Sequence, residues 1–117
     1  MKALRVILAS LAFSLLVLSS VALAGGGSMF VSPSSQTISV GGTAALKLDW
    51  SGYGLFNESF AMYYEGGGTI FDTYTCYSNC STGTNWFYHL YNTSGTRYPK
   101  AADQYGGVSN SVTVIVN

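Results

Sequence analysis

Two cysteines are the residues of this 117-residue chain whose spacing points most directly to chemistry. Cys76 and Cys80 lie four positions apart, and the only histidine, His89, lies in a segment with strand character, which makes a poor zinc site. Because the N-terminus has the features of an export signal, we expect a Cys76–Cys80 disulfide and no metal. So short a loop contributes about 2 kcal/mol, so the bond is expected to fix a local tip.

Catalytic motifs are missing from the sequence. It has no G-x-S-x-G elbow, no H-E-x-x-H pair and no glycine-rich phosphate loop with lysine. Two of the carboxylates Glu58, Glu65 and Asp72 could form the acid pair of a glycosidase, but nothing in the sequence places them in a cleft. We expect them to be solvated charges at turns and edges, and His89 to lie at a surface or rim. The chain is therefore predicted to have no catalytic residue, to need no cofactor and not to be an enzyme.

Aromatic side chains are the strongest candidates for binding, because nine tyrosines occur in one small domain. Exposed rings at strand spacing can stack on sugars or form the centre of a protein interface. The alternative is that β-strands simply favour tyrosine. Period-two alternation places five rings outward: Tyr63, Phe71, Tyr77, Phe87 and Tyr91.

Three Asn-x-Ser/Thr sequons fall in expected loops, at Asn57, Asn79 and Asn92. They are possible N-glycosylation sites, and the alternative is ordinary polar loop composition.

The N-terminus reads as a secretory signal peptide over residues 1–24. Lys2 and Arg5 precede an apolar run, and Ala22-Leu23-Ala24 is a small-x-small cleavage site; an uncleaved membrane anchor is the alternative. Residues 25–28 would be a flexible Gly/Ser leader and 29–117 the folded domain. After cleavage the chain would contain three basic and five acidic residues. Three cations are too few to bind the phosphates of a nucleic acid, so we expect no nucleic-acid partner. We expect a secreted or cell-surface protein without membrane attachment, whose partner is a protein or glycan at the cell surface.

Turn residues recur every 8 to 15 positions or so after the leader, and this rhythm is typical of an all-β domain. In the first segment, 29–40, Pro33 should mark the point where an edge strand switches between sheets. Residues 43–50 alternate most clearly, and further strands are expected within 60–64, 69–77, 85–91, 98–102 and 111–116. The predicted core is Ala44, Leu46, Leu48, Trp50, Phe60, Met62, Tyr64, Trp86, Leu90, Val112, Val114 and Val116. About seven such strands are expected to pack as a two-sheet antiparallel sandwich.

Both ends of the domain resemble bacterial and archaeal immunoglobulin-like domains. Residues 31–43, VSPSSQTISVGGT, look like the opening of such domains, and residues 101–116, AADQYGGVSNSVTVIV, look like their last hairpin. Residues 63–69, YYEGGGT, are similar to a turn of PKD-type surface domains but lack its aspartate and tryptophan. Pro99 departs from the pattern and requires a bulge or a late strand start. The resemblance implies an extracellular immunoglobulin-like, PKD-like sandwich.

Three functions are compatible with these features. The leading expectation is a noncatalytic surface module for architecture or adhesion, which the resemblance implies. The second is a carbohydrate-binding module that uses the outward aromatics. The third is a filament subunit that associates with further copies by exchanging its first strand, residues 29–40.

Overall fold

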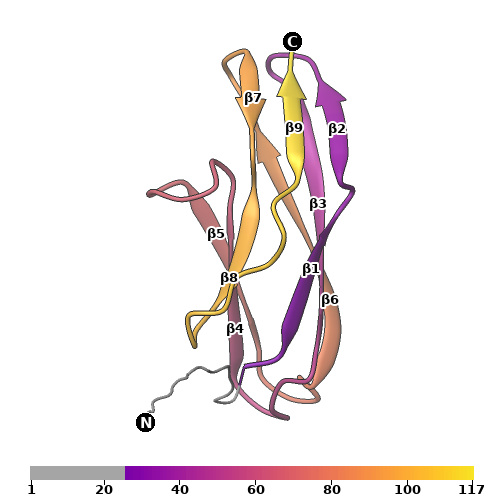
Figure 1. The fold of residues 1–117 in the computed structure, drawn as a ribbon, viewed down its shortest axis with the longest axis vertical. Coiled ribbons are helices and arrows are strands. Elements are labelled where there is room, and N and C mark those ends of the chain that lie inside the picture. Colours follow the sequence, from indigo (N-terminus) through magenta and orange to yellow (C-terminus); the bar gives the residue numbers. More distant parts are fainter. Residues whose placement is uncertain (1–25) are drawn as a thin grey trace, which may run out of the picture.

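Residues 26–117 form an all-β structure, with no helix in that range (Figure 1). The computed structural model describes this range, so the expected signal peptide and its cleavage site lie outside the described residues. No helix in the described part of the chain is long and apolar enough to cross a membrane. The strands are β1 (Ser28–Ser32), β2 (Ser35–Ile38), β3 (Thr43–Ser51), β4 (Glu58–Tyr63), β5 (Phe71–Cys76), β6 (Thr82–Leu90), β7 (Gly95–Arg97), β8 (Lys100–Asp103) and β9 (Thr113–Val116).

The strands pair in three three-stranded sheets, with the orders β1-β3-β6, β2-β9-β7 and β5-β4-β8. All neighbours are antiparallel except β2 and β9, which run parallel. The break in the first segment is confirmed, because β1 and β2 lie on either side of Pro33 and belong to different sheets. Because proline has no backbone N–H to donate to a neighbouring strand, it is well placed where the chain leaves one sheet and enters another.

β1 begins at Ser28, the last residue of the expected leader, and pairs there with Ser51. Gly27 lies directly before it, and a Cβ added at Gly27 would come within 2.1 Å of the Ser51 carbonyl oxygen. Only glycine therefore allows the chain to approach β3 so closely at this point.

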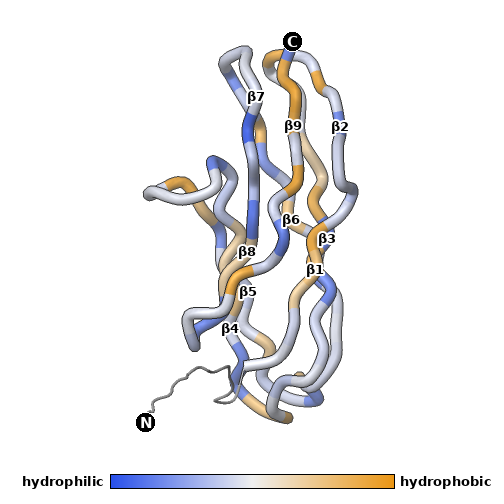
Figure 2. Tube along the Cα trace, in the orientation of Figure 1, coloured by the Kyte–Doolittle hydropathy of each residue, from blue (hydrophilic) through white to orange (hydrophobic). Residues whose placement is uncertain are grey.

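One core is shared by the three sheets. The alternation predicted for β3 is confirmed, since Ala44, Leu46, Leu48 and Trp50 are all buried. β9 is hydrophobic along most of its length and contributes Val114 and Val116 (Figure 2). Phe60, Met62, Tyr64 and Val112 are buried as expected, and the sequence did not indicate the buried Val31, Tyr53 and Ala101.

The prediction of which β6 side chains point into the core is wrong, because the alternation is shifted by one residue. Trp86 and Leu90, expected in the core, are 49% and 47% exposed, whereas Phe87 and Tyr91, expected outside, are 5% and 2% exposed. The register with β3 is the cause, because Phe87 lies opposite Leu46 and paired residues point to the same face. Both alternating sets of β6 are aromatic, so periodicity alone could not choose between them.

Pro99 interrupts what the sequence analysis expected to be one strand over 98–102. β7 ends at Arg97 and pairs with β9, while β8 begins at Lys100 and pairs with β4. Pro99 itself is fully buried. The late strand start that a proline requires therefore divides this run between two sheets.

Candidate binding surface

The solvent-facing side of the β1-β3-β6 sheet carries the most distinctive set of exposed side chains. Phe30 of β1, Trp86 and Tyr88 of β6 are 57%, 49% and 61% exposed. Strand pairing places Phe30 opposite Asp49, and Trp86 opposite Lys47. We call this surface the outer face; its residues are Phe30, Lys47, Asp49, Thr84, Trp86 and Tyr88.

Trp86, Tyr88 and the two charged side chains of the outer face lie beside one another. The Trp86 and Tyr88 rings are near-parallel, with centroids 6.4 Å apart and an interplanar angle of 17°. Lys47 Nζ lies 5.9 Å from the Trp86 ring centroid and 3.6 Å from Asp49 Oδ2. The Thr84 hydroxyl donates a hydrogen bond to Asp49 Oδ1. Cation–π attraction and this hydroxyl contact hold the charged side chains beside the rings.

A shallow depression of about 440 Å³ continues the outer face toward the start of β6. Its lining includes Phe30, Asp49, Trp50 and Thr84, so apolar walls and a carboxylate meet there. The combination offers stacking and hydrogen bonding to a ligand in one place.

The five predicted outward aromatics are divided by the structure. Tyr63 and Phe71 form a pair on β4 and β5, with centroids 5.0 Å apart, and Phe71 is 44% exposed. Tyr77 is 73% exposed at the loop tip. Phe87 and Tyr91 are buried, which removes them as binding residues, and Trp86 and Tyr88 of the outer face replace them. The alternation of Lys47 and Asp49 on β3 marked the outward side, but the register of β6 against it was not visible in the sequence.

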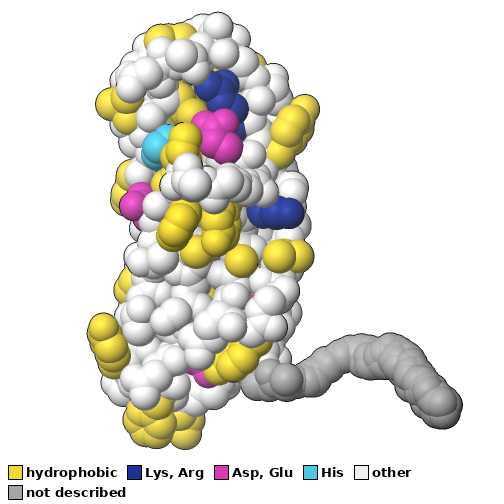
Figure 3. Space-filling model, turned by 90° about the vertical axis from the view of Figure 1, so that its left-hand side faces the viewer, with side chains coloured by type: hydrophobic (Ala, Val, Ile, Leu, Met, Phe, Trp, Pro, Cys, Tyr) yellow, Lys and Arg dark blue, Asp and Glu magenta, His cyan; other side chains and the backbone are white. Residues whose placement is uncertain are grey.

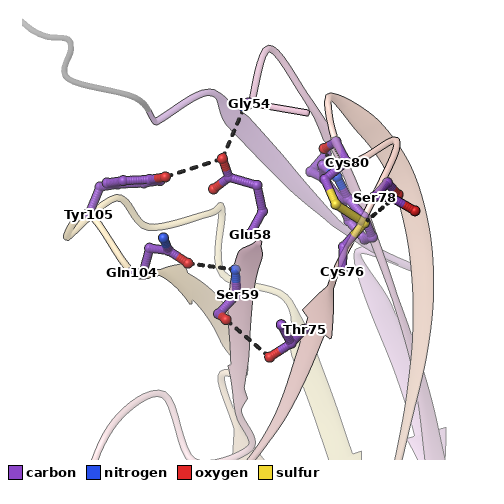
Figure 4. The surroundings of a disulfide bond; sticks show 10 residues. Gly54, Glu58, Ser59, Thr75, Cys76, Ser78, Cys80, Gln104 and Tyr105 are labelled. Carbon is purple, nitrogen blue, oxygen red and sulfur yellow. Dashed lines mark hydrogen bonds between the residues drawn. A yellow bond between two sulfur atoms is a disulfide. The ribbon is translucent and has the colours of Figure 1, made fainter. Parts of the chain in front are cut away.

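The three candidate carboxylates have separate structural partners, and a solvated role is wrong for Glu58. Glu58 is only 3% exposed, and its Oε2 accepts hydrogen bonds from Gly54 N at 3.0 Å and from the Tyr105 hydroxyl at 3.1 Å (Figure 4). Its Oε1 is buried without a hydrogen-bond partner. Glu65 pairs with Arg97 at 3.2 Å, and Asp72 accepts a 2.7 Å hydrogen bond from the Tyr64 hydroxyl. On the face shown in Figure 3, charged side chains are few, and cations and anions lie next to each other near one end.

Asp103 holds together the turn after β8. It accepts hydrogen bonds from the Tyr53 hydroxyl at 2.7 Å and from the backbone N–H groups of Tyr105 and Gly107 at 2.9 and 2.7 Å. Burial, and then the hydrogen bond to Asp103, raise the pKa of Tyr53 well above its usual value. The neutral phenol is thereby kept as a hydrogen-bond donor, so this network is structural.

His89 is half-buried against the core, near the rim position expected for it. Its ring stacks on Tyr64 at 4.2 Å with an angle of 10° and meets the edge of Tyr91 at 4.7 Å. Tyr91 in turn donates a 2.7 Å hydrogen bond to the Tyr64 carbonyl, and burial raises the pKa of Tyr91 to about 12. These contacts give the histidine a packing role.

The Cys76–Cys80 disulfide is present, with Cα atoms 5.7 Å apart. Cys80 is fully buried, and its carbonyl accepts a 2.8 Å hydrogen bond from the Trp50 indole N–H. The N–H of Cys80 donates to the Leu55 carbonyl at 3.0 Å. The disulfide thus anchors the β5–β6 tip on the core tryptophan, in addition to closing a local loop.

The three sequon asparagines, Asn57, Asn79 and Asn92, are all exposed and lie outside the strands. Asn57 and Asn79 have positive φ angles of 59° and 56°, a conformation that asparagine tolerates better than most residues. Turn geometry is thus a structural reason for asparagine at these two positions.

No protein-family profile and no curated protein matches this chain. Among solved structures, the crystal structure of a CARDB domain from Pyrococcus furiosus is similar, with a TM-score of 0.53 and 14% identity. The similarity covers 80% of this chain and 96% of that domain. A solution NMR structure of the same domain gives a TM-score of 0.52 and 12% identity, over 80% and 97% of the two chains. This chain has the CARDB-like, immunoglobulin-like fold.

That crystal structure is described as a complex with di-metal ions. Within residues 26–117 of this chain, no three His, Cys, Asp or Glu side chains gather where they could hold a metal ion. The residues present here therefore do not fit such a centre.

Proposed function

We propose that this chain is a noncatalytic immunoglobulin-like module that is exported and contributes to cell-surface architecture or adhesion through its outer face. The observation that carries the proposal is the cluster of Phe30, Trp86 and Tyr88, exposed together beside Lys47 and Asp49. Exposed aromatic and apolar side chains grouped on one side of a sheet are typical of an interaction surface.

Further support comes from the carboxylates and the histidine that were considered as catalytic candidates. Glu58, Glu65, Asp72 and His89 each contact a structural partner, and Asp72 and His89 share Tyr64 as theirs. The proposal includes the finer sandwich architecture, in which β2-β9-β7 and β5-β4-β8 form one layer, linked by the two-residue connection between β7 and β8. It also includes the signal peptide and the PKD-like turn at 63–69.

Binding of the immobilised chain to cell envelopes of the source organism tests the proposal. We expect the double variant W86S/Y88S to lose about tenfold or more in binding, because aromatic anchors dominate such interfaces. The matched control is Y63S/F71S, which removes a ring pair from β4 and β5 and should retain binding. Equal binding by the unaltered chain and W86S/Y88S would contradict the proposal.

A carbohydrate is the second candidate ligand, favoured by the near-parallel Trp86 and Tyr88 rings next to a carboxylate and hydroxyl groups. Envelope glycans should then change the fluorescence of Trp86 on titration, and W86F should abolish the change. A titration without a fluorescence change, combined with envelope binding that proteolysis of the envelopes removes, would assign the outer face to a protein partner instead.

A further inference from the structure

β6 is an unusually long and open sheet edge. It pairs along its whole length with β3, from Thr82 opposite Ser51 to Leu90 opposite Thr43. In the order β1-β3-β6 it is the last strand, so its other side has no strand partner within residues 26–117. Along its nine residues, β6 is therefore paired on one side only in the described part of the chain.

The hydrogen-bonding groups on the free side belong to alternate residues. The N–H of Tyr91 donates to the Gly42 carbonyl at 3.1 Å, and the Tyr91 carbonyl accepts from Gly41 N at 2.7 Å, so Tyr91 is directed toward β3. Because antiparallel strands alternate between bonded and non-bonded sides, the backbone groups on the open side are those of residues 82, 84, 86, 88 and 90. Of these, the Trp86 carbonyl already accepts a hydrogen bond from the Asn85 side chain, which an added strand would have to share or displace. The side chains of these five residues are exposed and point to the same side of the sheet as the outer face.

Two other open edges of the fold are closed by side-chain amides. Asn110 accepts from Val31 N at 2.8 Å and donates to the Val31 carbonyl at 2.9 Å, which covers β1. Gln36 brackets Ala45 in the same way, at 2.9 and 3.3 Å, where β3 extends beyond β1. On β6 the corresponding contact is a 3.2 Å hydrogen bond from Asn85 of the same strand to the Trp86 carbonyl.

β6 also lacks the residues by which proteins usually protect an edge. From Thr82 to Leu90 there is no Lys, Arg, Asp, Glu or Pro. An exposed edge with Trp86, Tyr88 and Leu90 on it is therefore suited to accept another strand.

We propose that β6 pairs antiparallel with β6 of a second copy of this chain, about a two-fold axis at Trp86. Trp86 is the midpoint of the strand, so this register overlaps all nine residues. It brings Thr84 opposite Tyr88, residues that both present free backbone groups. With the two-fold axis at Trp86, only Trp86 opposes its own counterpart, and no like charges meet because β6 contains no Lys, Arg, Asp or Glu.

The pairing goes beyond the proposed function, because it requires no ligand. It joins the two β1-β3-β6 sheets into one and doubles the outer face, with Trp86 of each copy beside that of the other. Aromatic cross-strand pairs add to the backbone hydrogen bonds that such an interface gains. The arrangement differs from exchange of residues 29–40, since β1 and β2 keep their own partners.

Site-directed disulfide cross-linking of the full chain tests this register. Opposed residues in a bonded pair have Cα atoms about 5.5 Å apart, within disulfide range, so W86C should cross-link to itself under mild oxidation. The matched control Y88C lies about 14 Å along the strand from its own counterpart and should not. The double variant T84C/Y88C should restore the cross-link. Non-reducing electrophoresis gives the yield, and mass spectrometry identifies the joined peptides.

The expected yield for W86C is about tenfold or more above that for Y88C, because only the former meets disulfide geometry. Light scattering should show a two-copy mass for the unaltered chain at high concentration. A W86C chain that melts like the unaltered protein but stays uncross-linked would overturn the proposal. So would Y88C cross-linking as fully as W86C, or a monomeric unaltered chain at millimolar concentration. None of these results depends on envelope binding, so the proposed function is tested separately.

Discussion

At the scale of single residues, Gly83 is a position where the core dictates the side chain. It lies opposite Trp50 in the pairing of β3 and β6, and a Cβ added there would come within 2.4 Å of the indole ring. The indole cannot simply move away, because its N–H is bonded to the Cys80 carbonyl and its ring packs on Phe60 at 4.5 Å. The absence of a side chain at 83 is therefore part of the tryptophan site.

Replacing this glycine should destabilise the domain. We expect G83A to lower the free energy of unfolding by about 1 to 3 kcal/mol, as overpacking of a core does. Urea denaturation followed by tryptophan fluorescence measures the change. G67A is the matched control, because a Cβ at Gly67 has no atom within 4 Å. Equal stability of the two variants would show that the Trp50 site can relax.

Tyr91 links stability to alkaline pH. Burial raises its pKa to about 12 in the folded state, against about 10 when unfolded. Its contribution to the free energy of unfolding is therefore complete below pH 10 and is lost as pH rises from 10 to 12. Y91F should cost about 1 kcal/mol at pH 7, through the lost hydrogen bond to the Tyr64 carbonyl, but lose less stability above pH 10.

Urea midpoints between pH 7 and pH 11 measure this difference. Y98F, at a 58% exposed position, is the control for removing a phenol at neutral pH and should match the unaltered chain there. If Y91F and the unaltered chain lose stability in parallel above pH 10, Tyr91 is not the responsible group.

At the scale of elements, the β5–β6 tip illustrates how a short disulfide can have more than local influence. The loop is short, so its entropic contribution alone is about 2 kcal/mol. However, Cys80 is fully buried and its backbone bonds both to Trp50 and to Leu55. The bond therefore positions a segment on which the core tryptophan depends.

Removal of the disulfide should therefore lower the free energy of unfolding by more than the entropic contribution of the closed loop. We expect C76S/C80A to lower the free energy of unfolding by about 2 to 4 kcal/mol. The Trp50 fluorescence should also shift to longer wavelength, since water would reach a loosened tip. L55A, with its backbone contact intact and an exposed side chain, is the control. A spectrum unchanged by C76S/C80A would mean that the tip holds its place without the bond.

At the scale of the whole molecule, the three sheets depend on one core. Trp50 of β3 contacts Phe60 of β4 and Tyr74 of β5, with centroids 4.5 and 5.9 Å apart. Val114 and Val116 of β9 belong to the same buried cluster. No sheet retains its buried face if another separates, so the domain should unfold in a single step.

The two tryptophans make this cooperativity measurable. Trp50 is 4% exposed and Trp86 is 49% exposed. W86F leaves the buried indole as the reporter, and its signal should change at the same urea concentration as far-ultraviolet circular dichroism. Transitions at separate concentrations would show that the sheets unfold independently.

The sequence by itself determined that the domain is all-β, that Cys76 and Cys80 pair, and that β3 buries its even-numbered residues. Local patterns were sufficient for these features, because alternation, turn residues and a four-residue cysteine spacing act within short segments. The strand break at Pro33 and the late start after Pro99 followed from the missing N–H of proline.

Only the tertiary structure decided which aromatics lie inside. Trp86, Tyr88 and Leu90 alternate with Phe87 and His89 of β6 and with Tyr91 directly after it, so both registers bury large side chains. Pairing with β3 fixed the choice, because Phe87 had to share a face with Leu46. The burial of Glu58 likewise needed the approach of Tyr105, which lies 47 residues further along the chain. A one-residue shift in a strand reverses its faces, and contacts between distant segments select the register.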